Sequence, residues 1–215
     1  MRYTSVLFDL DGTLLDTLGD LTAAMNRTLT RHGLPERTRQ QMRAALGNGA
    51  RRLMELSVPA GTDSALFETL LAEYNADYAA HCRIETAPYP GVAALLLKLH
   101  AQGRRLAIVS NKPDEAVRAL RADFFAGAVP IAVGETAAIR RKPAPDMLLA
   151  AMEKLGADPD KTVFVGDSEV DIATARAANL PCISVLWGFR DRDVLERAGA
   201  QQFAADIAQL QALLG

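Results

Sequence analysis

The sequence predicts an α/β fold built on a parallel sheet, with a helical segment inserted after the first strand. Two observations predict the sheet. Short apolar runs alternate with helical patterns, and most runs have few polar interruptions, as strands buried on both faces require. A third observation predicts the insertion, because the long stretch after the first apolar run shows helical periodicity and no convincing strand.

Five apolar runs are the expected strands, at residues 5–8, 106–109, 131–133, 163–165 and 183–186. The helices expected between them span residues 91–101, 113–122, 145–155 and 169–178. The second of these helices begins with Pro113, and proline suits a first turn because its missing N–H has no partner there.

The inserted segment is expected to span residues 16–88, which leaves residues 1–15 and 89–215 for the core. One helix is indicated by an apolar stripe that ends before Gly33 and consists of Leu18, Leu21, Met25 and Leu29. A second helix is expected over residues 64–81.

Composition narrows the possible partners. With 215 residues, 49% of them hydrophobic, the chain can bury a substantial core. A net charge of -2 without a long basic run argues against nucleic acid, and no apolar stretch is long enough to cross a bilayer. No signal peptide is indicated, because residues 1–4 lead straight into a strand pattern, and the only two cysteines, Cys82 and Cys182, are too few for a disulfide framework. We therefore expect a reduced, cytoplasmic protein, either a monomer or a homodimer.

Two carboxylates follow the first strand, in the stretch VLFDLDGT at residues 6–13. Asp-Gly is a common turn, but turn formation does not account for Asp9. If the chain stays extended through Leu10, Asp9 and Asp11 point to the same face and repel each other unless a cation lies between them. Mg²⁺ is the cation that such oxygen ligands favour, and α/β sheets bind ligands at these strand ends.

Other strand ends carry complementary groups: Ser110-Asn111, then Lys142 in the next loop, then Asp167 with Asp171. Each group also has an ordinary interpretation as a helix cap, a turn or a solvated lysine. Together they predict a phosphoryl-transfer site, in which Mg²⁺ and a lysine neutralise phosphoryl oxygens and an aspartate can attack phosphorus. Backbone N–H groups near Gly12 and Thr13 can help to hold these oxygens. The residues alone do not decide which aspartate attacks.

Four motifs resemble those of the haloacid dehalogenase superfamily and occur in its order: DLDGT at 9–13, SN at 110–111, KP at 142–143 and GDSEVD at 166–171. The stretches SNKPDEAV at 110–117 and RRKPAPDML at 140–148 are similar to its phosphoglycolate phosphatase branch. The resemblance implies a Rossmann-like core with an α-helical cap domain at residues 16–88.

The resemblance also implies residue roles. Asp9 would be the nucleophile and a Mg²⁺ ligand, while Asp11 would act as general acid and base and bind the metal through its backbone carbonyl. Asp167 would be a further metal ligand, supported by Asp171. The phosphoryl oxygens would be held by Gly12, Thr13, Ser110, Asn111 and Lys142.

The implied reaction is Mg²⁺-dependent hydrolysis of a small phosphomonoester through an aspartyl-phosphate, with 2-phosphoglycolate as the leading candidate. Asp11 argues against a dehalogenase, which has no leaving alkoxide to protonate. A phosphonatase needs a cap lysine, and residues 16–90 contain none. Thr13 favours hydrolysis over a phosphomutase, which usually has valine there. Inorganic pyrophosphatase, sugar-phosphate phosphatase or phosphomutase activity stays open, as does a non-catalytic binding scaffold.

One loop of the insertion is a candidate for substrate recognition. Gly47, Asn48 and Gly49 precede a helix whose first turn carries Arg51. Free N–H groups at a helix N-terminus bind anions, and arginine there opposes the helix dipole unless an anion is near. A substrate carboxylate would fit this loop; a plain turn with solvated arginines is the alternative.

Overall fold

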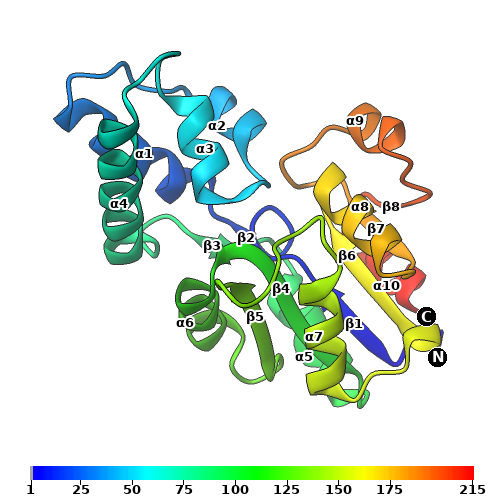
Figure 1. The fold of residues 1–215 in the computed structure, drawn as a ribbon. Coiled ribbons are helices and arrows are strands. Elements are labelled where there is room, and N and C mark those ends of the chain that lie inside the picture. The colour runs from blue at the N-terminus through cyan, green and yellow to red at the C-terminus, as the bar shows by residue number, and fades with distance from the viewer. Residues whose placement is uncertain (1) are drawn as a thin grey trace. The chain divides into compact units, whose positions relative to one another are not determined.

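A computed structural model describes residues 2–215 and confirms the α/β fold. Its main sheet has six strands, all parallel, in the order β5-β4-β1-β6-β7-β8 (Figure 1). The strands are β1 (Ser5–Phe8), β4 (Arg105–Pro113), β5 (Ile131–Glu135), β6 (Thr162–Gly166), β7 (Cys182–Val185) and β8 (Gln202–Ala204). Because β1 lies in the middle of the sheet, both of its neighbours, β4 and β6, end beside it.

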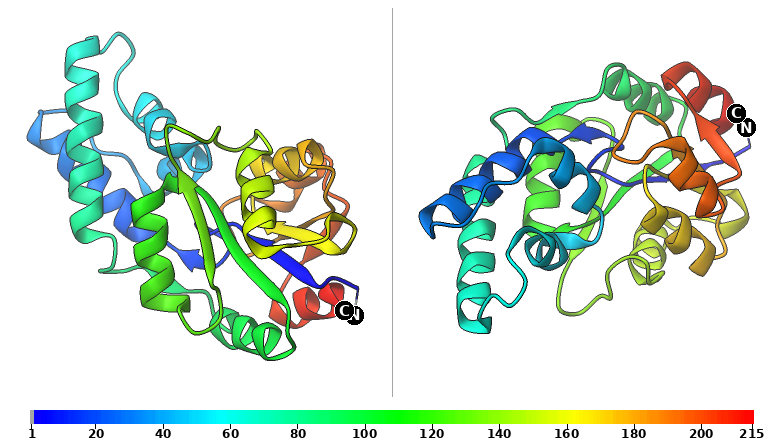
Figure 2. Two further views of the ribbon diagram at one scale, coloured as in Figure 1. Left: turned by 60° about the horizontal axis from the view of Figure 1, so that its bottom comes forward. Right: turned by 90° about the horizontal axis from the view of Figure 1, so that it is seen from above.

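Helices cover both faces of this sheet (Figure 2). Helices α5 (Val92–Ala101), α6 (Asp114–Phe125) and α10 (Ile207–Leu214) pack on one face, and α7 (Asp146–Leu155) and α8 (Glu169–Ala177) pack on the other. Helix α9 (Arg192–Arg197) contacts α8. A short 3₁₀ helix, Pro159–Lys161, leads into β6.

The core under α7 joins side chains from the central strands to the helix. Leu7, Phe164 and Met147 are each fully buried there. Burying a side chain of this size contributes roughly 1.5–3 kcal/mol. This packing fixes the strand ends on which the polar residues stand.

All five predicted strands are present, and the main differences in the large sheet lie at β4 and β8. β4 runs to Pro113 and does not end at Val109, with an irregularity in its pairing to β5 between these residues. Strand β8 was not predicted, because Gln202–Ala204 is short and only partly buried. The predicted helix at 113–122 begins at Asp114 and extends to Phe125.

The chain divides into two compact units, one formed by Met1–Leu15 and Pro88–Gly215 and the other by Asp16–Ala87. The second unit contains four helices, α1 (Leu18–Arg31), α2 (Arg39–Ala45), α3 (Gly49–Ser57) and α4 (Ser64–His81). In it α1 packs on α4 and α2, and α3 packs on the same two helices. The buried Asp20 carboxylate accepts the N–H groups of Ile84, Glu85 and Thr86, which ties the end of this unit to its start.

The chain passes between the units through two short strands, β2 (Leu15–Asp16) and β3 (Ala87–Pro88), which form a separate two-stranded sheet. Among residues 2–215, no helix has both the length and the apolar character needed to cross a membrane.

Candidate active site

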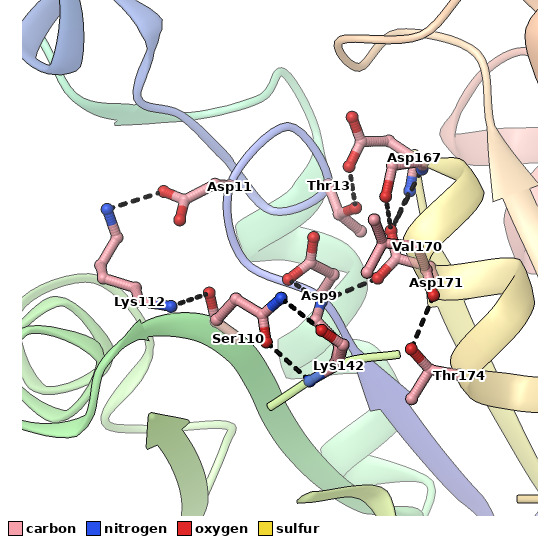
Figure 3. Close-up of polar contacts among 12 residues, drawn as sticks. Asp9, Asp11, Thr13, Ser110, Lys112, Lys142, Asp167, Val170, Asp171 and Thr174 are labelled. Carbon is pink, nitrogen blue, oxygen red and sulfur yellow. Dashed lines mark hydrogen bonds and ion pairs between the residues drawn. The ribbon is translucent and has the colours of Figure 1, made fainter. Parts of the chain in front are cut away.

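Asp9 lies at the centre of the polar cluster that surrounds the end of β1 (Figure 3). Its N–H donates to the Val165 carbonyl at 2.9 Å, so the pairing with β6 continues one residue past β1. Lys142 Nζ lies 2.7 Å from Asp9 Oδ1. Burial raises the pKa of Asp9 well above its ordinary value, and the carboxylate of Asp171 raises it further, while Lys142 opposes both effects.

Asp11 does not share the face of Asp9, contrary to the expectation of an extended chain. The chain bends at Leu10, whose carbonyl accepts the N–H groups of Thr13, Leu14 and Leu15. As a result Asp11 Oδ1 lies 3.0 Å from Lys112 Nζ, and Figure 3 shows the two aspartates directed toward different lysines.

Gly12 and Thr13 make this turn and support Asp167. The N–H of Gly12 donates to Leu15 O and that of Thr13 to Leu10 O, so both amides bond within the turn. The Thr13 hydroxyl donates to Asp167 Oδ1 at 3.2 Å. Gly12 has a φ of +84°, and a Cβ there would collide with the Asp167 carboxylate. These two positions therefore shape the surroundings of Asp167.

Ser110 and Asn111 come from the far end of β4. The Ser110 hydroxyl oxygen accepts the N–H of Lys112 at 3.3 Å, which leaves its own O–H to donate elsewhere. The Asn111 side chain donates to Lys142 O at 3.0 Å and accepts the Lys142 N–H at 2.8 Å. Asn111 thereby fixes the backbone that carries Lys142.

Lys142 is buried between two carboxylates. Its Nζ lies 2.7 Å from both Asp9 Oδ1 and Asp171 Oδ1, and 5.5 Å from the centre of the Phe164 ring. Burial alone would lower the pKa of Lys142, but the charges of Asp171 and Asp9 outweigh it and raise the pKa above its usual value. The ammonium is therefore a fixed positive charge at the centre of the site.

Asp167 and Asp171 follow β6 at the start of α8. Asp171 Oδ2 accepts bonds from the N–H groups of Asp167 and Ser168 and from the Ser168 hydroxyl, so Asp171 is held in place. Asp167 Oδ2 accepts the N–H of Phe189 at 2.7 Å. Burial and the Asp171 charge raise the pKa of Asp167 to about 7.

Oxygens of Asp9, Asp167 and Asp171 lie within 4.8 Å of one another, all on buried side chains, and form a cluster that could hold a metal ion. Burial, together with the charge of Asp171, raises the pKa of both Asp9 and Asp167, and the single ammonium of Lys142 faces three buried carboxylates. A divalent cation with oxygen ligands fits this cluster. The Asp11 side chain, which was predicted to lie with the others, faces Lys112 instead.

Three residues outside the predicted set also belong to this site: Lys112, Trp187 and Phe189. Trp187 Nε1 donates to Thr13 O at 3.0 Å, and the backbone of Phe189 bonds to Asp167 as described above. Both follow β7, so the search for groups directly after predicted strands, which located the other residues, could also have found these two. Lys112 directly follows Asn111, but its position depends on β4 continuing past Val109.

The predicted recognition loop lies in the second unit. Gly47 and Gly49 have φ values of +109° and +79°, and Asn48 precedes α3 without a side-chain cap. Arg51 donates to both oxygens of Glu68, at 2.9 and 2.8 Å, and lies over the Phe67 ring. The guanidinium that was expected to meet a substrate anion is paired within its own unit.

Comparison with known proteins identifies relatives over most of the chain. Residues 6–185 match the family model described as haloacid dehalogenase-like hydrolase. A phosphoglycolate phosphatase of Xanthomonas campestris pv. campestris (strain 8004) is 35% identical over 192 residues, which covers 88% of this chain and 86% of that protein.

Two further similarities bear on substrate and fold. An N-acetylmuramic acid 6-phosphate phosphatase of Pseudomonas aeruginosa PAO1 is 34% identical, covering 88% of this chain and 84% of that protein. A crystal structure from Lactobacillus delbrueckii subsp. bulgaricus is 35% identical and has a TM-score of 0.94, covering 100% of this chain and 99% of that chain. The similarity therefore extends through both units.

Proposed function

The chain belongs to the haloacid dehalogenase-like hydrolases, and we propose that within this family it is a Mg²⁺-dependent phosphatase of small phosphomonoesters. Its leading candidate substrate is 2-phosphoglycolate, and we propose that the reaction takes place in the cytoplasm. The observation that carries the proposal is the buried set of Asp9, Lys142 and Asp167, in which a nucleophile, a fixed cation and a candidate metal ligand meet.

The first step assigns Asp9 as nucleophile and Asp11 as general acid. An Asp9 carboxylate oxygen attacks phosphorus, the bond from phosphorus to the leaving oxygen breaks, and Asp11 transfers its proton to that oxygen. The products of this step are an alcohol and an aspartyl-phosphate. Lys142 lies 2.7 Å from Asp9 and orients it while neutralising phosphoryl charge.

The second step regenerates the enzyme. The Asp11 carboxylate takes a proton from a water molecule, whose oxygen attacks phosphorus, and the bond between phosphorus and Asp9 breaks. Inorganic phosphate leaves, and Asp11 is protonated for the next cycle. The Ser110 hydroxyl, whose oxygen already accepts the Lys112 N–H, is free to donate to a phosphoryl oxygen.

The carboxylates of Asp9 and Asp167 and the backbone carbonyl of Asp11 would hold the Mg²⁺ ion. When bound, Mg²⁺ supplies positive charge that neutralises the phosphoryl oxygens and the carboxylates around them. We assign Asp171 a supporting role, because its oxygens already accept bonds from Lys142, from Ser168 and from the backbone of Asp167.

The substrate is proposed from the relatives and from the second unit, which we propose to be the cap domain. 2-Phosphoglycolate and N-acetylmuramic acid 6-phosphate, the substrates named for two relatives, each combine a phosphomonoester with a carboxylate. In the cap we propose that Gly47, Asn48, Gly49 and Arg51 meet that carboxylate. The ion pair of Arg51 with Glu68 is exposed, so exchanging Glu68 for a substrate anion costs little free energy.

The test measures Mg²⁺-dependent phosphate release from four compounds side by side: 2-phosphoglycolate, N-acetylmuramic acid 6-phosphate, pyrophosphate and β-glucose 1-phosphate. We expect the two carboxylate-bearing phosphomonoesters to have the highest kcat/KM. Preferred turnover of pyrophosphate or glucose 1-phosphate would overturn the substrate assignment and leave the core chemistry standing. Release from none of the four and from no wider panel would overturn the enzyme proposal.

Arg51→Met tests the cap assignment. Its KM should rise about tenfold for the carboxylate-bearing substrates and stay unchanged for β-glucose 1-phosphate. Arg52→Met is the matched control, because Arg52 pairs with Glu55 on the same helix and has no assigned role. Equal effects of the two substitutions would overturn the assignment.

A further inference from the structure

Lys112 is a second buried lysine beside the reacting groups. Its side chain is 4% exposed, and its Nζ lies 3.0 Å from Asp11 Oδ1. Figure 3 shows the Asp11 carboxylate turned toward this ammonium, while Asp9 faces Lys142. Each of the two aspartates assigned to the chemistry therefore has its own lysine.

The local fold brings Lys112 to this position. β4 continues to Pro113, which pairs with Glu135 of β5, so Lys112 is still part of the strand. The N–H of Lys112 donates to Ser110 Oγ, and helix α6 begins only after Pro113. The bond to Ser110 and the pairing of Pro113 thus hold the backbone of Lys112 on both sides. Its side chain extends from this constrained backbone to Asp11.

The backbone beneath Asp11 is equally constrained. Leu10 O accepts three N–H groups of the following turn, and Gly12 N–H donates to Leu15 O. The remaining freedom of Asp11 is rotation of its side chain, since the turn fixes its main chain. An ion pair to Oδ1 removes that rotation and leaves Oδ2 as the oxygen that can exchange a proton. A buried ammonium also needs a partner, because an isolated buried charge is costly.

We propose that Lys112 is a positioning residue for Asp11, which holds the acid/base carboxylate in the orientation that proton transfer requires. The inference rests on the phosphatase function proposed above and adds a residue to it. Lys112 acts through Asp11 and, in this proposal, does not bind the substrate. Geometric misplacement of a catalytic group by about 1 Å can cost a factor of about 100 in rate.

The main test is a double-mutant cycle with Lys112→Met, Asp11→Asn and the double variant, assayed with ethyl phosphate. We expect Lys112→Met to lower kcat about 10- to 100-fold with KM within about threefold. In the Asp11→Asn background the same substitution should cost less than about twofold, because the group it positions is already gone. Lys112→Arg should recover most of the loss, since it keeps the charge.

A leaving-group comparison provides the second readout. p-Nitrophenolate leaves without a proton, so the first turnover of p-nitrophenyl phosphate by Lys112→Met should stay within about threefold of the wild type. Ethyl phosphate, whose leaving group needs the proton, should show the full loss. Lys154→Met, the same change on the exposed face of α7, is the matched control and should alter neither rate.

The outcomes separate the alternatives. An undiminished loss in the Asp11→Asn background, or an equal loss for both leaving groups, would overturn the positioning role. A rise in KM for 2-phosphoglycolate but not for ethyl phosphate would also overturn it, and would make Lys112 a contact for the substrate carboxylate. A wild-type protein that hydrolyses none of these esters refutes the proposed function itself, whereas an active wild type with an unaffected Lys112→Met refutes this inference alone. If Lys112→Met does not fold, Lys112→Gln replaces it in the cycle.

Discussion

Asn111 and Lys142 stand 31 positions apart in the chain and exchange two hydrogen bonds, in which the Asn111 side chain satisfies both the N–H and the carbonyl of Lys142. This pair joins the end of β4 to the loop before α7. The position of the ammonium that contacts Asp9 and Asp171 therefore depends on the Asn111 amide, which holds the backbone of Lys142.

Replacing Asn111 by alanine should lower both the stability of the protein and its kcat. Two buried backbone groups of Lys142 would lose their partners, which costs roughly 1–3 kcal/mol of unfolding free energy, and kcat should fall about 10- to 100-fold as Lys142 shifts. Urea unfolding and steady-state kinetics with p-nitrophenyl phosphate measure the two quantities.

Asn26→Ala is the matched control. Asn26 makes the same two-way bond to the backbone of Arg37 within the second unit, at 3.0 and 2.8 Å. It should cost comparable stability and leave kcat within about threefold of the wild type. If both variants lose kcat equally, the loss comes from general destabilisation and the assigned role of Asn111 is wrong.

Asp9→Asn should abolish turnover while the protein stays folded. An amide cannot act as the nucleophile, so kcat should fall by a factor of at least about 1000. Because burial and Asp171 disfavour the ionised Asp9, removal of its charge should leave the Tm in EDTA equal to or above that of the wild type. Thermal unfolding measures the Tm, and phosphate release measures kcat. Retention of most activity would contradict the nucleophile assignment.

Metal binding should weaken as the pH falls through about 7. Asp167 has a pKa raised to about 7 by burial and by Asp171, so protons compete with the metal for its carboxylate below that pH. Above it the carboxylate is ionised and the affinity should level off. For one competing proton, the Kd for Mg²⁺ should rise about tenfold per pH unit below the pKa.

The only tryptophan offers a direct readout of this titration, since Trp187 bonds to Thr13, whose hydroxyl contacts Asp167. Intrinsic fluorescence during Mg²⁺ titration at several pH values gives the Kd without any turnover. Asp167→Asn should abolish the response, and Trp187→Phe removes the signal as a blank. A Kd that does not change with pH would contradict Asp167 as a ligand.

Gly12→Ala and Gly61→Ala form a pair that isolates steric contact from backbone strain. Their φ values are +84° and +81°, so both substitutions carry a similar strain of roughly 1–2 kcal/mol. A Cβ at Gly12 would collide with Asp167, whereas Gly61 has nothing within 4 Å of that position. Only Gly12→Ala should weaken Mg²⁺ binding, which the Trp187 titration measures. Equal affinities in the two variants would mean that Asp167 can move aside.

The sequence was sufficient to locate the groups that strand ends carry. Apolar runs ended where polar residues began, and that pattern places Asp9, Ser110 and Asp167 at one edge whatever the details of packing. The sequence could not give side-chain directions, because the bend at Leu10 depends on three N–H groups competing for one carbonyl. An extended chain was assumed there, and it wrongly brought Asp11 to the face of Asp9.

Lys112 and β8 were missed for a related reason. Both owe their conformation to pairing with a distant strand: β4 is extended by the contact of Pro113 with Glu135, and β8 exists through its pairing with β7. Such pairing overrides local preference and leaves little trace in a short polar stretch. Contacts between Arg51 and Glu68 likewise join two helices and could not be read from either one.

The two short strands β2 and β3 give the inserted unit an entrance and an exit that are hydrogen-bonded neighbours. Within the insertion, the Asp20 carboxylate accepts the N–H of Glu85, which joins the start of the segment to its end. Just outside the insertion, the Tyr89 N–H donates to Leu14 O. Because the two ends of the segment are adjacent, another segment whose ends are equally close could connect to the core at the same two strands. We therefore expect that residues 16–87 can be replaced by the corresponding segment of a relative without rebuilding the strands that hold Asp9.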